Sequence, residues 1–144
     1  MNKLVILACS KTKIWDNNDS LTNDDKVKAK DAYQGYTFRQ GKKYAEKNKY
    51  PYLILSAKYG IINPDKSIGD YNKKLSSKKE ARKIKKKSKE KLNKIAEEYD
   101  EIFLIGGNKY YRKIFEDLNK EKFNYLKAKN QGDLRKKVKE LVKG

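Results

Sequence analysis

Residues 53–71, LILSAKYGIINPDKSIGDY, contain the transition that decides the fold. A short apolar run, 52–55, has the length and composition of a buried strand. It stops at Ser56, and polar side chains follow at the point where α/β sheets usually build their sites. Gly60 permits backbone angles that a Cβ would forbid, and residues 63–65 predict a turn. We expect a strand followed by a long loop that carries a site. The alternative is a loop that only covers the edge of the sheet.

Strands and helices alternate along the rest of the chain. Further strands are predicted at residues 3–8, 101–105 and 123–128, and residues 14–26 are expected to form a loop. Helices are predicted at residues 27–48, 77–99 and 109–119, and a last one begins near residue 132. This order predicts an α/β fold for one domain, 1–144: a three-layer sandwich with a short, mostly parallel, four-stranded sheet flanked by helices.

Three loops of such a sheet should emerge at one edge, because parallel strands have their carboxyl ends on the same side. They follow Ala8, Leu55 and Ile105. The first loop reads Cys9-Ser10-Lys11-Thr12-Lys13, whose hydroxyls, N–H groups and ammonium groups suit an anion. The third begins with Gly106-Gly107 and leads directly into a helix, where free N–H groups can hold a phosphate or carboxylate. Cys9 is more typical of a small apolar residue at a strand end than of a reactive thiol.

The composition favours a polyanionic partner and excludes several kinds of site. Lys and Arg total 37 against 19 acidic residues, a formal net charge of +18, so we expect contact with nucleic acid. A lysine-rich proteome would account for the charge differently, although it normally brings matching glutamate. The absence of His rules out Ser-His-Asp and Cys-His systems, and Cys9 alone makes neither a disulfide framework nor a thiolate cluster. We expect no metal, no cofactor and no membrane span, and the cytoplasm as the location.

The sequence resembles a small α/β family related to the peroxide-stress, YaaA-like proteins. The resemblance rests on CSKTK after the first strand, on Tyr33, on LSAKYGIINPDKSIGDY and on IGGNKYY, which together span residues 4–111. It departs where similar proteins tend to carry a proline before the tyrosine, since Gly69-Asp70 precede Tyr71 here. The resemblance implies association with nucleic acid and, more distantly, an architecture like that of uracil-DNA-glycosylase-type enzymes. As the partner we expect DNA rather than RNA.

The first functional hypothesis is an N-glycosylase that excises a modified or damaged base. Such an enzyme needs an extruded nucleotide, a stacking wall and a carboxylate that stabilises an oxocarbenium-like sugar. Asp65 and Asp70 are the candidate carboxylates, and Lys58 is a candidate for stabilising the leaving base or attacking the sugar. The expected binding residues for the substrate and its phosphates are Cys9, Ser10, Lys11, Lys13, Tyr33, Ser56, Tyr59, Gly60, Tyr71, Gly106 and Gly107.

Two alternatives belong to other functional classes. In the first, the same cleft recognises DNA without turnover, and the lysine-rich helix predicted at 77–99 carries most of the affinity. In the second, the protein acts on the N-glycosidic bond of a free nucleoside or nucleotide, which leaves the high positive charge unexplained. Asp65 also has a purely structural alternative, as a turn residue bonded to its own backbone.

Overall fold

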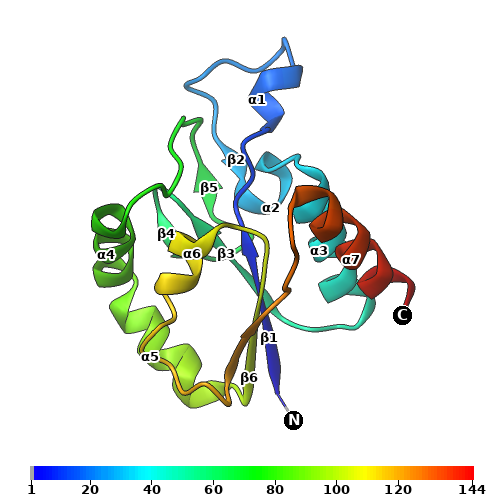
Figure 1. Cartoon of the computed structure of the whole chain (residues 1–144). Helices are drawn as coiled ribbons and strands as arrows, with labels where there is room; N and C mark the ends of the chain where they lie inside the picture. The colour runs from blue at the N-terminus through cyan, green and yellow to red at the C-terminus, as the bar shows by residue number, and fades with distance from the viewer. Residues whose placement is uncertain (1) are drawn as a thin grey trace.

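A five-stranded sheet forms the centre of the computed structural model, which describes residues 2–144 (Figure 1). Its strand order is β4-β3-β1-β6-β7, and β1, β3, β6 and β7 run parallel. The bounds are β1 (Lys3–Ala8), β3 (Tyr52–Ser56), β4 (Gly60–Ile62), β6 (Glu101–Ile105) and β7 (Phe123–Tyr125). The predicted α/β class is confirmed. The fifth strand was not predicted: β4 folds back antiparallel to β3, pairing Ser56 with Gly60.

Helices cover both faces of the sheet, as the predicted three-layer sandwich requires (Figure 1). On one face lie α3 (Tyr36–Lys47) and α7 (Gln131–Lys143), and on the other α4 (Lys78–Lys87), α5 (Lys89–Glu98) and α6 (Lys109–Lys113). The apolar strand β1 supplies both layers, because alternate side chains of a strand point to opposite faces. Leu4 and Ile6 pack with α4 and α5, whereas Val5 and Leu7 pack with α3 and α7.

The predicted helix at 27–48 is broken into three elements. Residues 27–28 form β2 (Val27–Lys28), which pairs antiparallel with β5 (Ser67–Ile68), and α2 (Ala29–Ala32) follows. Tyr33 is extended and Gly35 is the N-cap residue of α3. A Cβ on Gly35 would lie only 2.6 Å from the Cβ of Ser10, so the loop after β1 and the start of α3 touch at this glycine.

Other element boundaries differ from the prediction for local reasons. The helix predicted at 77–99 begins where expected, with Ser77 as its N-cap: Ser77 Oγ accepts the Glu80 N–H at 3.2 Å. The helix then divides at the buried Ser88. There the Ser88 hydroxyl accepts the N–H of Ile61 from β4. A short helix, α1 (Ile14–Asn17), interrupts the predicted loop, and α6 and β7 are shorter than predicted.

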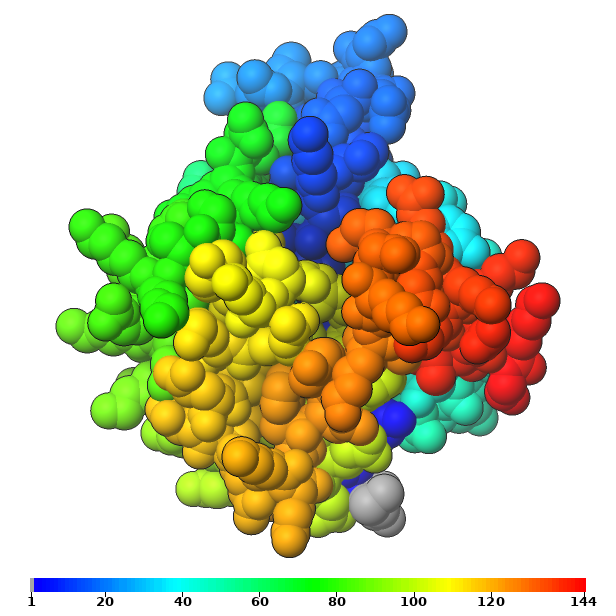
Figure 2. Space-filling view, in the orientation of Figure 1, coloured from blue at the N-terminus to red at the C-terminus, as the bar shows by residue number. Residues whose placement is uncertain are grey.

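The three loops expected at one edge do meet there. The parallel registers of β1 with β3 and with β6 bring Ala8, Leu55 and Ile105 to the same end of the sheet. In Figure 2 the surface is hollowed where the blue, yellow and orange segments approach one another. Within residues 2–144, no helix has the length and apolar character that crossing a bilayer requires.

Candidate anion-binding cleft

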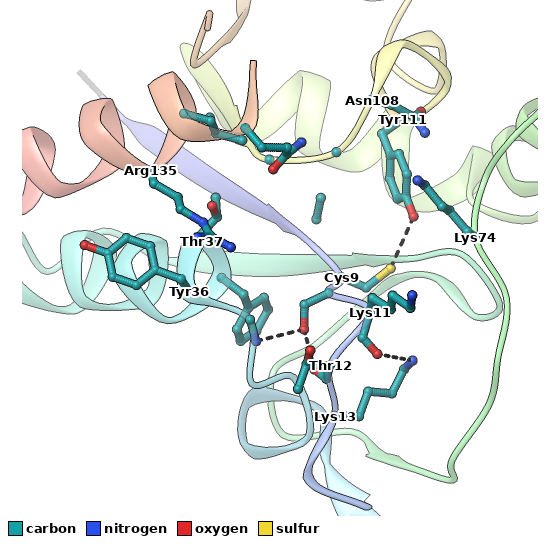
Figure 3. Close-up of a pocket in the computed structure, with 18 of the residues that line it drawn as sticks. Cys9, Lys11, Thr12, Lys13, Tyr36, Thr37, Lys74, Asn108, Tyr111 and Arg135 are labelled. Carbon is teal, nitrogen blue, oxygen red and sulfur yellow. Dashed lines mark hydrogen bonds between the residues drawn. The ribbon is translucent and has the colours of Figure 1, made fainter. Parts of the chain in front are cut away.

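A cleft of about 520 Å³ opens at the carboxyl edge of the sheet (Figure 3). Its walls come from the β1–α1 loop, the first turn of α3, the segment 72–74, the β6–α6 loop with Tyr111, and the start of α7. This volume is in the range of cavities that hold small ligands. The site therefore combines two of the predicted loops with parts of the chain far away in sequence.

The cleft is positively charged. Its lining includes the side chains of Lys11, Lys13, Lys73, Lys74 and Arg135, and none of the described residues that line it is Asp or Glu. Like charges held around one cavity repel each other, and an anionic ligand removes that repulsion. The arrangement therefore selects for an anion.

The amino end of α3 adds to this positive potential. Gly35, Tyr36, Thr37 and Phe38 line the cleft, and α3 has neither a side-chain cap nor an acidic residue in its first turn. The first N–H groups of a helix have no intrahelical acceptor, and the helix dipole places partial positive charge at this end. An anion in the cleft would meet these N–H groups.

Lys13 is unusual among the cleft cations because it is only 5% exposed. Its ammonium group donates to the Lys11 carbonyl oxygen at 3.2 Å and lies 4.6 Å from the centre of the Tyr71 ring. Within the described part of the chain, no carboxylate forms an ion pair with it. Burying a cation without a counter-ion is costly, so the cleft holds a charge that a bound anion would neutralise.

A cluster of hydroxyl groups lies behind the cleft, and we call Tyr33, Ser56 and Tyr71 the hydroxyl cluster. The Tyr71 oxygen lies 2.7 Å from that of Tyr33 and 3.0 Å from Ser56 Oγ. Ser56 Oγ also accepts the N–H groups of Lys58 and Tyr59, which ties the β3–β4 turn to the cluster. Burial raises the pKa of both Tyr33 and Tyr71 well above the ordinary value, so both phenols remain protonated donors.

Cys9 and Tyr111 meet where the first and third loops approach. Cys9 Sγ lies 3.5 Å from the Tyr111 hydroxyl oxygen, and both residues line the cleft (Figure 3). Burial, and then the neighbouring thiol, raise the pKa of Tyr111. This contact links β1 to α6 across the floor of the site.

The structure separates the predicted site residues into three groups. Six line the cleft: Cys9, Ser10, Lys11, Lys13, Gly106 and Gly107. Tyr33, Ser56 and Tyr71 lie behind it, and Tyr59 contacts Tyr71 edge to face with centroids 5.7 Å apart. Neither Tyr59 nor Tyr71, both predicted to bind substrate, is among the residues that line the cleft.

The predicted catalytic residues and Gly60 are outside the cleft lining. Asp65 is exposed and pairs with Lys30 at 3.0 Å, and the hydrogen bond and charge of Lys30 lower the pKa of its carboxyl group. Asp70 is half-buried and Lys58 exposed, with the Lys58 ammonium 5.2 Å from the Tyr59 ring centre. Gly60 faces Ser88 on the α4–α5 side. The structure thus does not bring a predicted carboxylate to the lining of the cationic cleft.

Several lining residues were missed by sequence reasoning. Asn108 and Tyr111 were noted only as part of IGGNKYY and not as site residues, and Lys73, Lys74 and Arg135 were not considered. Asn108 had a recognisable signal, because an Asn directly before a helix is a preferred N-cap, and its side chain accepts the Tyr110 N–H at 2.9 Å. Arg135 had none, since its position depends on how α7 packs on α3. The described residues hold no group of three or more His, Cys, Asp or Glu side chains that would ligate a metal.

Comparisons with known proteins match the chain to a family whose function is unknown. A family model described as "Family of unknown function (DUF6884)" matches residues 4–140. "Uncharacterized protein YfjM" of Bacillus subtilis (strain 168) is 36% identical over 73 residues, which are 50% of this chain and 47% of that protein. The match therefore covers about half of each chain. No solved structure matches significantly. The resemblance to YaaA-like proteins and to uracil-DNA-glycosylase-type architecture stays a prediction.

Proposed function

Because the chain belongs to a family of unknown function, DUF6884, we propose its function from its own cleft: it binds nucleic acid by taking phosphate groups into the cationic cleft. The observation that carries this proposal is the set of five cationic side chains around a cavity whose described lining contains no acidic residue. Nucleic acid is the favoured anion because the chain has a formal net charge of +18, far more than a small anionic ligand needs.

A second basic surface supports the same partner. The helices α4 and α5 expose cations over most of their outer side: Arg82, Lys83, Lys86, Lys87, Lys89, Lys91 and Lys94. These residues lie in the segment 77–99, which the DNA-binding alternative predicts to carry most of the affinity for DNA. A strand entering the cleft would extend beyond a 520 Å³ cavity, and flanking phosphates need further cations. The cleft and the helices thus make separable contributions.

Neutralising the cleft tests the proposal. We expect Lys11→Gln/Lys74→Gln/Arg135→Gln to weaken binding of a fluorescent oligonucleotide by about 10-fold or more, because three phosphate contacts are lost. The slope of log K against log salt should become shallower by about 2 for single strands. Affinity is measured by anisotropy over a salt series, with single- and double-stranded DNA and RNA.

A matched variant removes the same charge elsewhere. Lys43→Gln/Lys49→Gln/Lys120→Gln changes three exposed lysines that neither line the cleft nor belong to the basic surface of α4 and α5. It should reduce affinity only slightly. Equal losses in the two triple variants would show that the positive charge acts without a site, and that result contradicts the proposal. A larger loss on neutralising Lys83, Lys86 and Lys89 than on neutralising the cleft would assign the affinity to α4 and α5.

Base excision is a second candidate. The observation that favours it is a cleft of ligand size at the carboxyl edge of a parallel sheet, where α/β enzymes place their chemistry. Asp70 is the candidate carboxylate that remains, because Asp65 is held by Lys30 away from the cleft. Excision requires that the segment around Tyr71 bring Asp70 toward a bound sugar.

Base excision predicts that the protein forms abasic sites in DNA as well as binding it. Incubation with DNA that carries modified bases should give abasic sites, scored by alkaline cleavage, and Asp70→Asn should abolish them while Asp65→Asn should not. Salt-sensitive binding with no abasic product on any substrate would remove base excision for those substrates and leave the binding function.

A further inference from the structure

We propose that the cleft is built for a terminal phosphate group, a phosphate monoester, rather than for an internal phosphodiester. The inference rests on the proposed function and specifies which part of a nucleic acid the cleft takes. Two sources share this chemistry: the phosphorylated end of a strand and a free nucleotide. The residue that points to it is Lys13.

Lys13 is available to an anion that reaches deep into the cleft. Lys13 lines the cleft, and only 5% of the residue is exposed. Of the three N–H bonds of the ammonium group, one donates to the Lys11 carbonyl, and the Tyr71 ring lies beside the charge. Two donors therefore remain for a ligand.

Backbone donors without an acceptor in the described residues lie in the same cleft-lining loop as Lys13. The N–H groups of Ser10, Lys11 and Thr12 donate no hydrogen bond within the described part of the chain. The uncapped first turn of α3 lies next to them, because the Gly35 N–H donates to Ser10 Oγ at 3.1 Å. A loop and a helix start joined in this way can direct several N–H groups at one phosphate.

The two kinds of phosphate differ in the number of ester bonds that attach them to the rest of the nucleic acid. An internal phosphodiester is attached on both sides, so bringing it to a buried lysine requires the chain to enter and leave the cleft. A monoester is attached on one side and presents three oxygens to the donors. It also carries close to two negative charges at neutral pH, against one for a diester. A cleft with a buried cation and no carboxylate among its described lining residues matches the monoester better.

The experiment compares ligands that differ only in the terminal phosphate. Binding is measured by calorimetry for adenosine, adenosine 5′-monophosphate and adenosine 3′-monophosphate. It is also measured for one short oligonucleotide with 5′-phosphate, 3′-phosphate or hydroxyl ends. We expect at least one monophosphate to bind about 10-fold or more tightly than adenosine, and the same end phosphate to raise oligonucleotide affinity by a similar factor.

Lys13→Met tests the residue itself, because methionine fills similar space without charge. We expect it to reduce monophosphate affinity by about 10-fold to 100-fold and to abolish the preference for a phosphorylated end. Lys11→Met, which removes an exposed cleft cation, should cost only a few-fold and keep the preference. Circular dichroism verifies folding. Lys13→Arg retains the charge and should retain part of the preference, which separates a charge effect from a packing effect.

The outcomes separate this inference from the proposed function. Equal affinity for phosphorylated and hydroxyl ends, with Lys13→Met no worse than Lys11→Met, would overturn the terminal-phosphate site and leave salt-sensitive nucleic-acid binding intact. Monophosphate binding that depends on Lys13, with no binding of any oligonucleotide, would support the site and overturn the proposed function. Binding of neither class would overturn both.

Discussion

The free energy of unfolding should fall steeply above pH 10, because three tyrosines, two of them buried and one partly buried, resist ionisation in the folded state. Burial raises the pKa of Tyr33, Tyr71 and Tyr111 above the value of about 10 for an unfolded tyrosine. When the pKa of a tyrosine is higher in the folded than in the unfolded protein, the folded protein holds that proton more tightly. The contribution of the protonated phenol to the free energy of unfolding is therefore complete below pH 10. Above pH 10 each phenol loses about 1.4 kcal/mol of that effect per pH unit, and three together lose about 4 kcal/mol by pH 11.

Tyr71→Phe separates two effects of the Tyr71 hydroxyl on stability: its hydrogen bonds at neutral pH and its resistance to ionisation above pH 10. At pH 7 the variant should be less stable by about 1–3 kcal/mol, since it removes the hydroxyl that bonds both Tyr33 and Ser56. Above pH 10 its stability should fall less steeply than that of the natural protein, so the difference between them shrinks. Urea unfolding at a series of pH values measures both. Parallel curves above pH 10 would contradict the assignment of Tyr71 as a partly buried, protonated phenol.

Gly60→Ala should reduce the free energy of unfolding by about 3 kcal/mol, through backbone strain and a lost hydrogen bond. Gly60 has φ of +78°, a region that residues with a Cβ rarely adopt. A Cβ there would also lie 2.6 Å from Ser88 Oγ, which accepts the N–H of Ile61. Moving that hydroxyl would detach β4 from the junction of α4 and α5. Chemical denaturation measures the loss.

Gly69→Ala is the matched control in the same loop. The nearest atom to a Cβ on Gly69 is the Tyr59 hydroxyl oxygen at 3.9 Å, and its φ lies outside the positive region. This variant should be within about 0.5 kcal/mol of the natural protein or slightly more stable, because alanine restricts the unfolded chain. A similar loss of unfolding free energy in both variants would contradict this explanation. It would show that replacing either glycine destabilises the fold, whatever the backbone conformation at residue 60.

The class of fold was predictable because its signals are local. The runs at 3–8, 52–55 and 101–105 are continuous and apolar, which is typical of strands covered on both faces, and they became β1, β3 and β6. The helix predicted at 77–99 starts with α4, and Gly60 indicated a special backbone conformation, which its positive φ confirms. The unpredicted strand β4 has only three residues, and its pairing depends on the turn that folds it back on β3.

The site was only partly predictable because side chains far apart in sequence complete it. The CSKTK loop and the double glycine were identified, since each follows a strand whose carboxyl end must lie at the shared edge. Tyr59, Tyr71, Asp65 and Asp70 were expected beside them because they follow β3. The chain instead leaves along β4 and β5, so Asp65 reaches Lys30 while Tyr71 is used in hydrogen bonds behind the cleft.

The sequence by itself therefore determined the parallel α/β sheet, the edge at which its loops meet and the positive charge of the protein. Each follows from residue type and short-range order: apolar runs, glycine positions and the excess of lysine. Tertiary structure alone decided that Lys13 is buried, that Arg135 joins the cleft and that no carboxylate lines it within the described residues. Burial and charge at one point depend on every segment that packs there, and α7 and residues 72–74 are placed by contacts across the fold rather than by their own sequence.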